Sequence, residues 1–189
     1  MSAIDVLSFW FGEPGSADHL RPRDLWFTRS EATDRLIVER FGAVVERALV
    51  GQHDDWAATP RGALALIVLL DQFTRNMFRG TPRAFAGDAR ALALSMRLVD
   101  TSRDTTLAPV ERWFVYMPLE HSERLLDQYE SVRLFERLAA DGMDAPLDWA
   151  RRHFDVVKRF GRFPHRNEIL GRASSPEELA FLAQPGSRF

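Results

Sequence analysis

The segment Asp-Gln-Phe-Thr-Arg-Asn, from Asp71 to Asn76, holds the first group of side chains suited to chemistry, and it follows directly on an apolar run. On a helix, Asp71 and Arg75 lie four residues apart and share a face, as do Gln72 and Asn76. This pattern is typical of an anion site in which Arg75 binds the ligand and Asp71 holds the guanidinium in place. A structural interpretation is favoured over it: an ion pair and an amide pair that join neighbouring helices, since buried charges must be paired in any case.

A second group follows Pro118, where Glu120, His121 and Glu123 stand close together. If Pro118 opens a helix, Glu120 and Glu123 share one face of it. Two neighbouring carboxylates raise the pKa of one of them, which suits acid–base chemistry, and a histidine titrates near neutrality. Here too a structural interpretation is favoured, because carboxylates in the first turn of a helix complement its dipole and Glu120 precedes Arg124 by four residues.

The third group is the run Arg159-Phe160-Gly161-Arg162-Phe163-Pro164-His165-Arg166-Asn167. Arginines that alternate with aromatic residues are able to stack on bases and bind phosphates. The net charge of −2 argues against a nucleic-acid partner, and a compact anion such as a phosphate or a carboxylate fits better. The structural alternative is that Arg159 is one of the cations that suit a helix C-terminus, with Gly161 and Pro164 as stop signals.

A metal site would need ligands from distant parts of the chain. The available side chains are His121, His153 and His165, together with Glu120 or Glu123. Histidines so far apart in sequence are weak support for such a site, so we assign no metal and no cofactor.

The composition excludes several classes of protein. The chain of 189 residues has no cysteine, which removes disulfides, thiol nucleophiles and cysteine-ligated zinc. The sequence also lacks a Gly-x-Ser-x-Gly elbow, a His-Glu-x-x-His motif, a glycine-rich phosphate loop and a dinucleotide fingerprint. The N-terminus has no basic region, and its apolar run at residues 6–11 is too short for a signal peptide. We therefore expect a cytoplasmic protein with no membrane partner, either a monomer or a homodimer.

Charge is distributed unevenly along the chain. Residues 151–172 contain seven Lys or Arg against two acidic residues, whereas residues 120–130 contain four acidic residues against one arginine. These two segments are as able to attract each other as to attract a ligand.

A central helix over residues 63–78 must position the first group. Its first half, Ala63 to Leu70, is apolar on every side, which indicates a buried helix. This run falls far short of the ~20 residues that cross a bilayer. Thr59-Pro60 supplies a cap that opens the helix, and Arg79-Gly80 closes it.

Further helices are expected before and after the central one. A helix over residues 4–11 ends at Gly12, and a helix capped by Ser30 ends at Gly51. The second of these carries an apolar stripe made of Ile37, Phe41, Val44, Val45 and Ala48. Another helix starts at Thr81-Pro82 or at Gly87-Asp88, with a stripe made of Leu92, Met96 and Val99.

The C-terminal half also reads as helices. Pro109 begins one that carries Trp113, Phe114 and Met117, and Pro118 interrupts it and opens the next. That next helix runs to about Ala140, with Leu125, Tyr129 and Val132 facing inward. A helix over residues 148–160, a turn over 164–170, and a capping box at Ser175-Pro176-Glu177-Glu178 that opens a last helix through Leu182 complete the chain. No segment alternates like a strand, so we predict a single all-α domain of stacked hairpins over residues 1–189.

The polar groups also carry a family resemblance. The runs at 69–76, 116–123 and 159–167, the opening at 6–12, and Gly171-Arg172 with Glu177-Glu178 resemble the bacterial proteins grouped as domain of unknown function 924. The likeness covers nearly the whole chain, and Thr74 departs from it where many relatives are expected to have proline. The resemblance implies an all-helical fold similar to the right-handed superhelix of tetratricopeptide-repeat proteins. It implies no established activity.

We expect the three polar groups to meet in one pocket for a small anionic ligand. Positive charge would come from Arg75, Arg162 and Arg166. Hydrolase-like acid–base chemistry would use Glu120, His121, Glu123 and His165. The remaining expected ligand-binding residues are Asp71, Gln72, Asn76, Arg159 and Asn167.

Two other functions stay open beside this one. Helical hairpins also build interaction modules that bind a peptide or protein partner in a concave face. Alternatively, the three groups form one buried ion-pair network whose role is structural. The sequence does not decide whether the protein is an enzyme.

Overall fold

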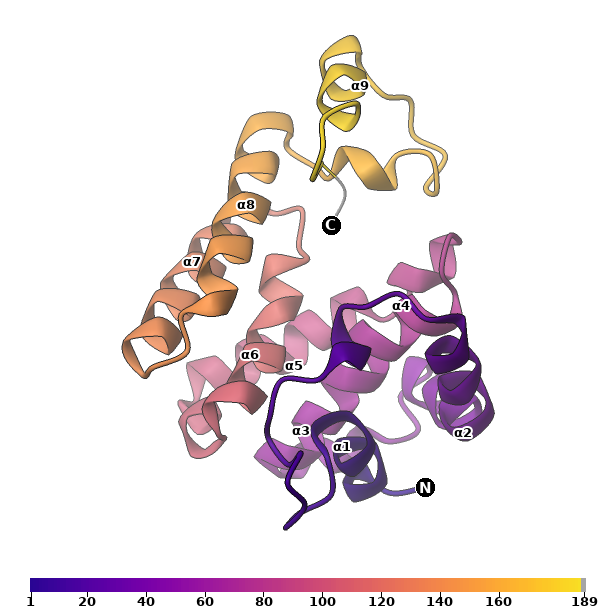
Figure 1. Ribbon diagram of the computed structural model, residues 1–189, viewed down its shortest axis with the longest axis vertical. Coiled ribbons are helices and arrows are strands. Elements are labelled where there is room, and N and C mark those ends of the chain that lie inside the picture. Colours follow the sequence, from indigo (N-terminus) through magenta and orange to yellow (C-terminus); the bar gives the residue numbers. More distant parts are fainter. Residues whose placement is uncertain (188–189) are drawn as a thin grey trace.

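The computed structural model describes residues 1–187, and the regular secondary structure in that range consists of helices without strands. The α-helices are α1 (Ala3–Phe11), α2 (Glu31–Leu49), α3 (Pro60–Ile67), α4 (Thr74–Met77), α5 (Asp88–Asp100), α6 (Pro109–Glu120), α7 (Leu125–Ala140), α8 (Ala145–Phe160) and α9 (Pro176–Leu182). Short 3-10 helices are η1 (Asp24–Trp26), η2 (Asp54–Ala58), η4 (Pro82–Phe85), η5 (Arg103–Thr106) and η6 (Pro164–Arg166). The predicted all-α class is confirmed (Figure 1).

The predicted central helix is present and buried on all sides. Helix α3 runs into a π-helical segment, η3 (Val68–Phe73), which continues as α4. Every residue from Gly62 to Thr74 is buried. Thr59 caps α3, because its Oγ1 accepts a hydrogen bond from the Gly62 amide at 3.0 Å. The apolar run therefore anchors the core, as its composition predicts.

The π-helical turn is the point where the central helix differs from the regular helix expected. A π turn holds one residue more than an α turn, and such turns are frequent at functional sites. Thr74 Oγ1 donates a hydrogen bond to the Leu70 carbonyl oxygen at 2.8 Å. Arg75 Nη1 donates one to the Asp71 carbonyl oxygen at 2.5 Å. These side chains satisfy buried carbonyl groups that need a partner near the wide turn.

The start of α5 packs directly on the π turn. A Cβ atom at Gly87 would lie 2.1 Å from the Leu70 carbonyl oxygen, so a glycine is required for this approach. Helix α5 begins at Asp88, which is the later of its two predicted starts, and the Thr81-Pro82 start produces only η4. The close approach places Asp88 beside the polar end of the central helix.

The inward face of α5 differs from the prediction. The stripe Leu92, Met96 and Val99 was expected to be buried, but Met96 is 38% exposed and the other two are only half-buried. The buried residues are the small Ala91 and Ser95 together with Leu98. Small side chains permit α5 to pack closely on the central helix. Because the apolar pattern follows the large side chains, it predicts the wrong buried face of α5.

The boundary between α6 and α7 also corrects a prediction. Pro118 lies inside α6, which continues to Glu120, and α7 starts only at Leu125. A proline removes one N–H from the helix ladder, and near the end of α6 the helix continues through it.

The intervening turn changes which face of α7 is buried. Leu125 is 39% exposed and Tyr129 is 53% exposed, while Val132 is half-buried, so the predicted inward face is wrong. The buried face consists of Asp127, Gln128, Ser131, Leu134, Phe135 and Leu138.

The other predicted helices are confirmed with small shifts of their ends. The whole stripe of α2 is buried, and Ser30 and Ser175 cap α2 and α9 through their hydroxyl oxygens. Helix α8 begins at Ala145 rather than 148 and ends before Gly161, whose φ of 69° lies in the left-handed region that favours glycine.

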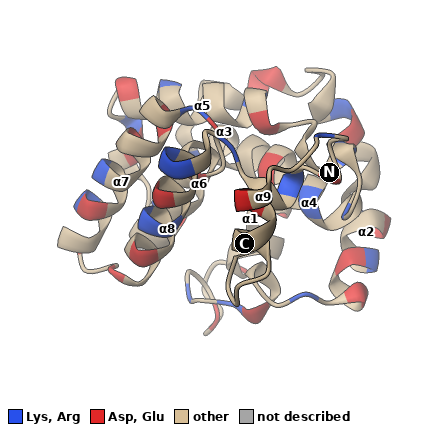
Figure 2. Cartoon of the chain, turned by 90° about the horizontal axis from the view of Figure 1, so that it is seen from above, with Lys and Arg blue, Asp and Glu red and all other residues tan. Residues whose placement is uncertain are grey.

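The layout of the elements separates two ends of the molecule. Helices α7 and α8 pack side by side next to α6, and η6 with α9 lies at the end of the molecule away from α1 (Figure 1). Charges of both signs are interspersed over the helices (Figure 2). No helix within residues 1–187 has the length and apolar character needed to cross a membrane.

Candidate functional site

The three polar groups predicted from the sequence are connected by direct contacts. The His121 ring is 2.8 Å from the Asp71 carboxylate, which joins the first group to the second. The Glu123 carboxylate accepts a hydrogen bond from the Phe163 amide at 2.8 Å, which joins the second group to the third. The two contacts join residues that are 50 and 40 positions apart, which the fold brings to one end of the central helix.

Asp71 is the centre of these contacts and is fully buried. Its Oδ1 atom lies 2.8 Å from His121 Nδ1 and 3.1 Å from Arg75 Nη1, and its Oδ2 atom accepts from Gln72 Nε2 at 2.6 Å. Burial raises the pKa of Asp71, but the Arg75 charge and the His121 contact outweigh it and hold that pKa well below its ordinary value. Asp71 is therefore a carboxylate at every physiological pH.

Asp88 belongs to the same network, although the sequence analysis did not assign it to the site. Arg75 donates to both of its oxygens, with distances of 3.0 Å and 3.2 Å. Burial raises the pKa of Asp88 above its ordinary value despite the Arg75 charge. An aspartate at the first position of a helix is common as a dipole partner, so nothing in the local sequence marks this one as part of a site.

His121 is held in one tautomer by this arrangement. Because Asp71 is ionised, the proton on the imidazole lies on Nδ1 and is donated to the carboxylate. This leaves Nε2 as the acceptor atom of the ring. Burial, together with the nearby Arg75, lowers the pKa of His121 below its ordinary value, so the ring is neutral at pH 7. A neutral histidine oriented by a buried carboxylate is the arrangement of a general base.

Arg166 is a buried cation with few partners. Its side chain is 8% exposed, and its one ion-pair contact within the described residues, from Nη1 to Asp88 Oδ2, spans 3.8 Å, which is too long for a hydrogen bond. Its Nε is buried without a hydrogen-bond partner within residues 1–187. The guanidinium stacks on the rings of Phe163 at 4.5 Å and Phe85 at 4.8 Å. Burial and the nearby Arg75 lower the pKa of Arg166 to about 10, so it stays charged at neutral pH.

A cavity of about 220 Å³ opens beside these groups. It is lined by Asp88, Ala89, Leu92, Pro118, His121, Ser122, Glu123 and Arg166. The arginine, the histidine and the carboxylates face an apolar wall from α5 and α6, so this cavity combines a charged side with an apolar one. That combination is typical of small-molecule sites.

Glu120 and Glu123 do not form the predicted carboxylate pair. Glu120 ends α6, and its carboxylate lies 2.9 Å from His153 Nδ1. Glu123 lies in the following turn and forms a bidentate pair with Arg172, at 2.7 Å and 2.9 Å. Burial raises the pKa of Glu123, but the hydrogen bonds from Arg172 and the Phe163 amide outweigh it, so that this pKa lies below its ordinary value. The two carboxylates therefore have separate partners, and the lowered pKa of Glu123 contradicts a raised pKa for this member of the pair.

The Glu123–Arg172 pair joins the acidic segment to the basic one. This is the mutual attraction that their opposite charges predict. It fixes the turn after α6 to the chain beyond η6 and so closes one side of the cavity.

The predicted amide pair is also absent. Asn76 Nδ2 donates to Asp34 Oδ1 at 2.7 Å, while Gln72 donates to Asp71 and to the Met117 sulfur. The π turn changes the spacing between Gln72 and Asn76, so the rule for regular helices does not apply to them.

The remaining residues of the third group lie at different depths. Arg162 pairs with Glu178 at 2.7 Å and ties η6 to α9, and exposed Arg159 stacks on Phe160. The Asn167 amide contacts Ser174 and Arg172. None of these three lines the cavity. His165 lies next to the Phe163 ring, and burial with the Arg166 charge lowers its pKa to about 3.

The side chains considered as metal ligands from the sequence are not gathered into one cluster. Within residues 1–187 no three His, Asp or Glu side chains are grouped so that they could hold a metal ion. The His121 and His153 rings are 6.1 Å apart, and each has its own carboxylate partner.

Comparisons with known proteins agree with the fold. A comparison with curated proteins finds no match. The structure is similar to that of a protein of unknown function from Agrobacterium tumefaciens, with 34% sequence identity, a TM-score of 0.85 and 96% of each chain covered. The family profile described as bacterial protein of unknown function, DUF924, matches residues 6–186. The chain therefore belongs to the DUF924 family.

Proposed function

We propose that the protein binds a small anionic molecule in the cavity beside Arg166. The observation that carries this proposal is a buried guanidinium that lines the cavity, whose Nε has no hydrogen-bond partner within residues 1–187 and whose contact to Asp88 is long. A buried cation with so few hydrogen bonds is costly to maintain, and an oxyanion in the cavity would provide the missing ones. Arg75 is already paired with both Asp71 and Asp88, so its role is to position Asp88 rather than to bind the ligand.

The size of the cavity restricts the ligand. A volume of about 220 Å³ is smaller than the roughly 300–1,000 Å³ of sites for drug-sized molecules. A small carboxylate with a short apolar part suits the arginine on one side and Ala89, Leu92 and Pro118 on the other. We place this function in the cytoplasm, in a protein that forms one helical domain over residues 1–189.

We further propose that His121 acts on the bound molecule as a general base. Its Nε2 would take a proton from a water molecule whose oxygen attacks a carbonyl carbon of the ligand, while Asp71 stabilises the imidazolium that results. The imidazolium would then return the proton to the leaving alcohol or amine as the carbonyl C–O or C–N bond breaks. Glu123, which is paired with Arg172, would hold the turn that carries His121 and Ser122. The reaction class is hydrolysis of a small ester or amide that bears a carboxylate.

Amide NMR titrations with acetate, succinate and inorganic phosphate test the binding step. Saturable shifts are expected at residues 88–92 and 119–123, and Arg166→Gln should weaken that binding at least about tenfold. Arg159→Gln removes an exposed arginine near the same segment and should titrate like the wild type. If Arg166→Gln also titrates like the wild type, or if none of the anions shifts these residues, the binding site is refuted.

Hydrolysis of a panel of small carboxylate-bearing esters and amides tests the base. His121→Gln should lower the rate by about 10²-fold or more, since this is the usual contribution of a general base. Activity that persists in His121→Gln and disappears in Arg166→Gln would support the binding site and contradict the role of His121 as general base.

A second candidate function is an interaction module, favoured by exposed apolar side chains on α7 and α8. Leu126 is 73% exposed, Tyr129 is 53% exposed and Trp149 is 48% exposed. In this alternative the hairpins stack as in a tetratricopeptide-like superhelix and dock a peptide. A partner that binds the wild type and Arg166→Gln but not Leu126→Glu would favour it.

A further inference from the structure

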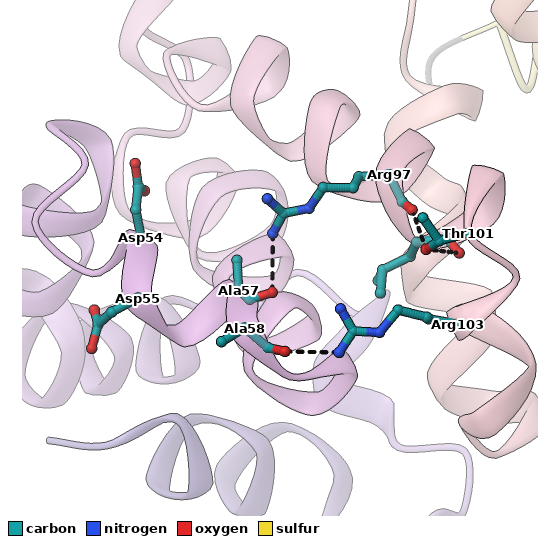
Figure 3. A pocket seen from close by; sticks show the side chains of 8 residues that line it. Asp54, Asp55, Ala57, Ala58, Arg97, Thr101 and Arg103 are labelled. Carbon is teal, nitrogen blue, oxygen red and sulfur yellow. Dashed lines mark hydrogen bonds between the residues drawn. The ribbon is translucent and has the colours of Figure 1, made fainter.

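The molecule has a second and larger cavity, which shares no lining residue with the cavity at Arg166. It measures about 360 Å³ and lies where η2, α5 and η5 meet. Its lining consists of Asp54, Asp55, Ala57, Ala58, Arg97, Leu98, Thr101 and Arg103. Figure 3 shows the two arginines reaching from α5 and η5 toward the end of η2.

The two guanidinium groups are held in place by backbone oxygens. Arg97 Nη2 donates to the Ala57 carbonyl at 3.0 Å, and Arg103 Nη2 donates to the Ala58 carbonyl at 2.7 Å. Because these carbonyls belong to successive residues, two positive charges are fixed next to each other. Each guanidinium has five N–H donors, so most of the donors remain available at the cavity.

Neither guanidinium has an acidic partner among residues 1–187. The described ion pairs engage many other arginines of the chain, but neither Arg97 nor Arg103. Of the two aspartates that line the cavity, Asp54 is already paired with Arg90. Figure 3 shows Asp54 and Asp55 pointing away from both guanidinium groups. The two neighbouring cations therefore repel each other, and no carboxylate within residues 1–187 forms an ion pair with either of them.

We propose that this cavity is a second anion site, which binds a doubly charged oxyanion between Arg97 and Arg103. Two planar forks side by side match the oxygens of a phosphate group or of a dicarboxylate. Leu98 and the two alanines give the cavity an apolar wall, which reduces screening by water on that side. Thr101 is not a competing donor, since its hydroxyl donates to the Arg97 carbonyl oxygen at 2.6 Å. The site stands on observations independent of those at Arg166.

Amide NMR titration of the full chain with inorganic phosphate tests this site, with succinate as a second arm. Saturable shifts are expected at residues 97–103, and Arg97→Gln and Arg103→Gln should each weaken that binding at least about tenfold. Asp55→Asn removes a negative charge that lines the cavity and has no ion pair within residues 1–187, so it should tighten the binding. Binding by phosphate alone assigns a phosphate site, and binding by succinate alone assigns a dicarboxylate site.

The controls distinguish anion binding in this cavity from a purely structural role of the two arginines and from binding in the cavity at Arg166. Arg166→Gln should leave the shifts at 97–103 unchanged, and Arg151→Gln, at an exposed surface pair, should do the same. Arg97→Lys keeps the charge but loses the fork, so its binding should fall between those of the wild type and Arg97→Gln. The proposal is overturned if neither anion shifts residues 97–103, or if the folded Arg97→Gln and Arg103→Gln variants bind like the wild type.

Discussion

His121 Nδ1 lies 2.8 Å from Asp71 Oδ1, and this contact joins two helices that the sequence separates by 50 residues. The aspartate is fully buried and the histidine side chain is 12% exposed. The Asp71 carboxylate also contacts Arg75 and accepts a hydrogen bond from Gln72, so three side chains stabilise its negative charge. The contact fixes both the tautomer and the orientation of the ring.

Replacement of Asp71 by asparagine should be strongly destabilising. Arg75 would keep its charge in a buried place and lose one of its two carboxylates, and breaking a buried pair of this kind costs about 3–5 kcal/mol. Denaturant unfolding at pH 7 measures the loss. Asp148→Asn, in a surface pair with Arg152 whose partners are 67% and 54% exposed, should cost no more than about 1 kcal/mol. Equal costs for the two variants would show that the Asp71 network contributes little.

The stability of the fold should fall as pH decreases from 7 to 5. Burial lowers the pKa of His165 to about 3, whereas an unfolded histidine titrates near 6.5. The unfolded chain therefore binds the extra proton first, so the free energy of unfolding rises with pH between these values. For this group alone the loss from pH 7 to 5 is roughly 2 kcal/mol. His121, whose pKa is also lowered by burial, adds to the loss in the same direction.

Unfolding of His165→Gln at several pH values measures this term. The dependence on pH between 7 and 5 should be flatter than in the wild type. His53→Gln, which removes a histidine stacked on Trp56 away from the network, serves as the control. A slope unchanged in His165→Gln would contradict the assignment.

Gly87→Ala should separate α5 from the π turn. The added Cβ would overlap the Leu70 carbonyl oxygen, so the backbone must move, and overpacking of this kind typically costs about 1–3 kcal/mol. Since Asp88 follows Gly87, its bidentate pair with Arg75 should weaken as well. Gly42→Ala is the matched control, because its Cβ would meet only the Met77 methyl group at 3.6 Å. That change, within α2, should be neutral or stabilising by up to about 1 kcal/mol.

Glu123→Gln should loosen the C-terminal segment without unfolding the core. Glu123 accepts from Arg172 and from the Phe163 amide, which ties residues 163–172 to the end of α6. Hydrogen exchange should become faster in residues 163–182 and stay slow in α3. Glu130→Gln, in a surface pair with Arg133 on α7, should leave the exchange of both regions unchanged. Faster exchange throughout the chain would instead show that the contacts of Glu123 stabilise the whole fold.

Much of the fold follows from local signals in the sequence. Ser30, Thr59 and Ser175 act as the helix caps that their positions predict, and the apolar run before Asp71 forms the buried central helix. Faces were harder to predict than helices. In α5 the buried side chains are small, and in α7 they include Asp127, Gln128 and Ser131, so apolar periodicity selects the wrong side.

The site was predictable in part, because its members cluster in three short polar groups. Asp71, Arg75, His121 and Arg166 do meet at one end of the central helix. Nothing in the local sequence identifies Asp88 as a member of the candidate site, since its role depends on the approach of Gly87 to the Leu70 carbonyl oxygen. Helical spacing predicts that Glu120 and Glu123 share one face. The structure instead has a turn between them, which only the tertiary fold reveals.

The π segment gives the central helix one residue more than a regular α-helix would hold over the same turn. Deleting one apolar residue between Val68 and Leu70 would convert the turn to an ordinary α-helix with every polar residue retained. Because only the extra residue of the wide turn is lost, the side chains after the deletion would keep nearly the same orientation relative to α3. A deletion within the regular turns of α3 would instead rotate all later side chains by about 100° and turn Asp71 away from His121. The wide turn therefore makes this part of the helix more tolerant of a single-residue deletion than the regular turns before it.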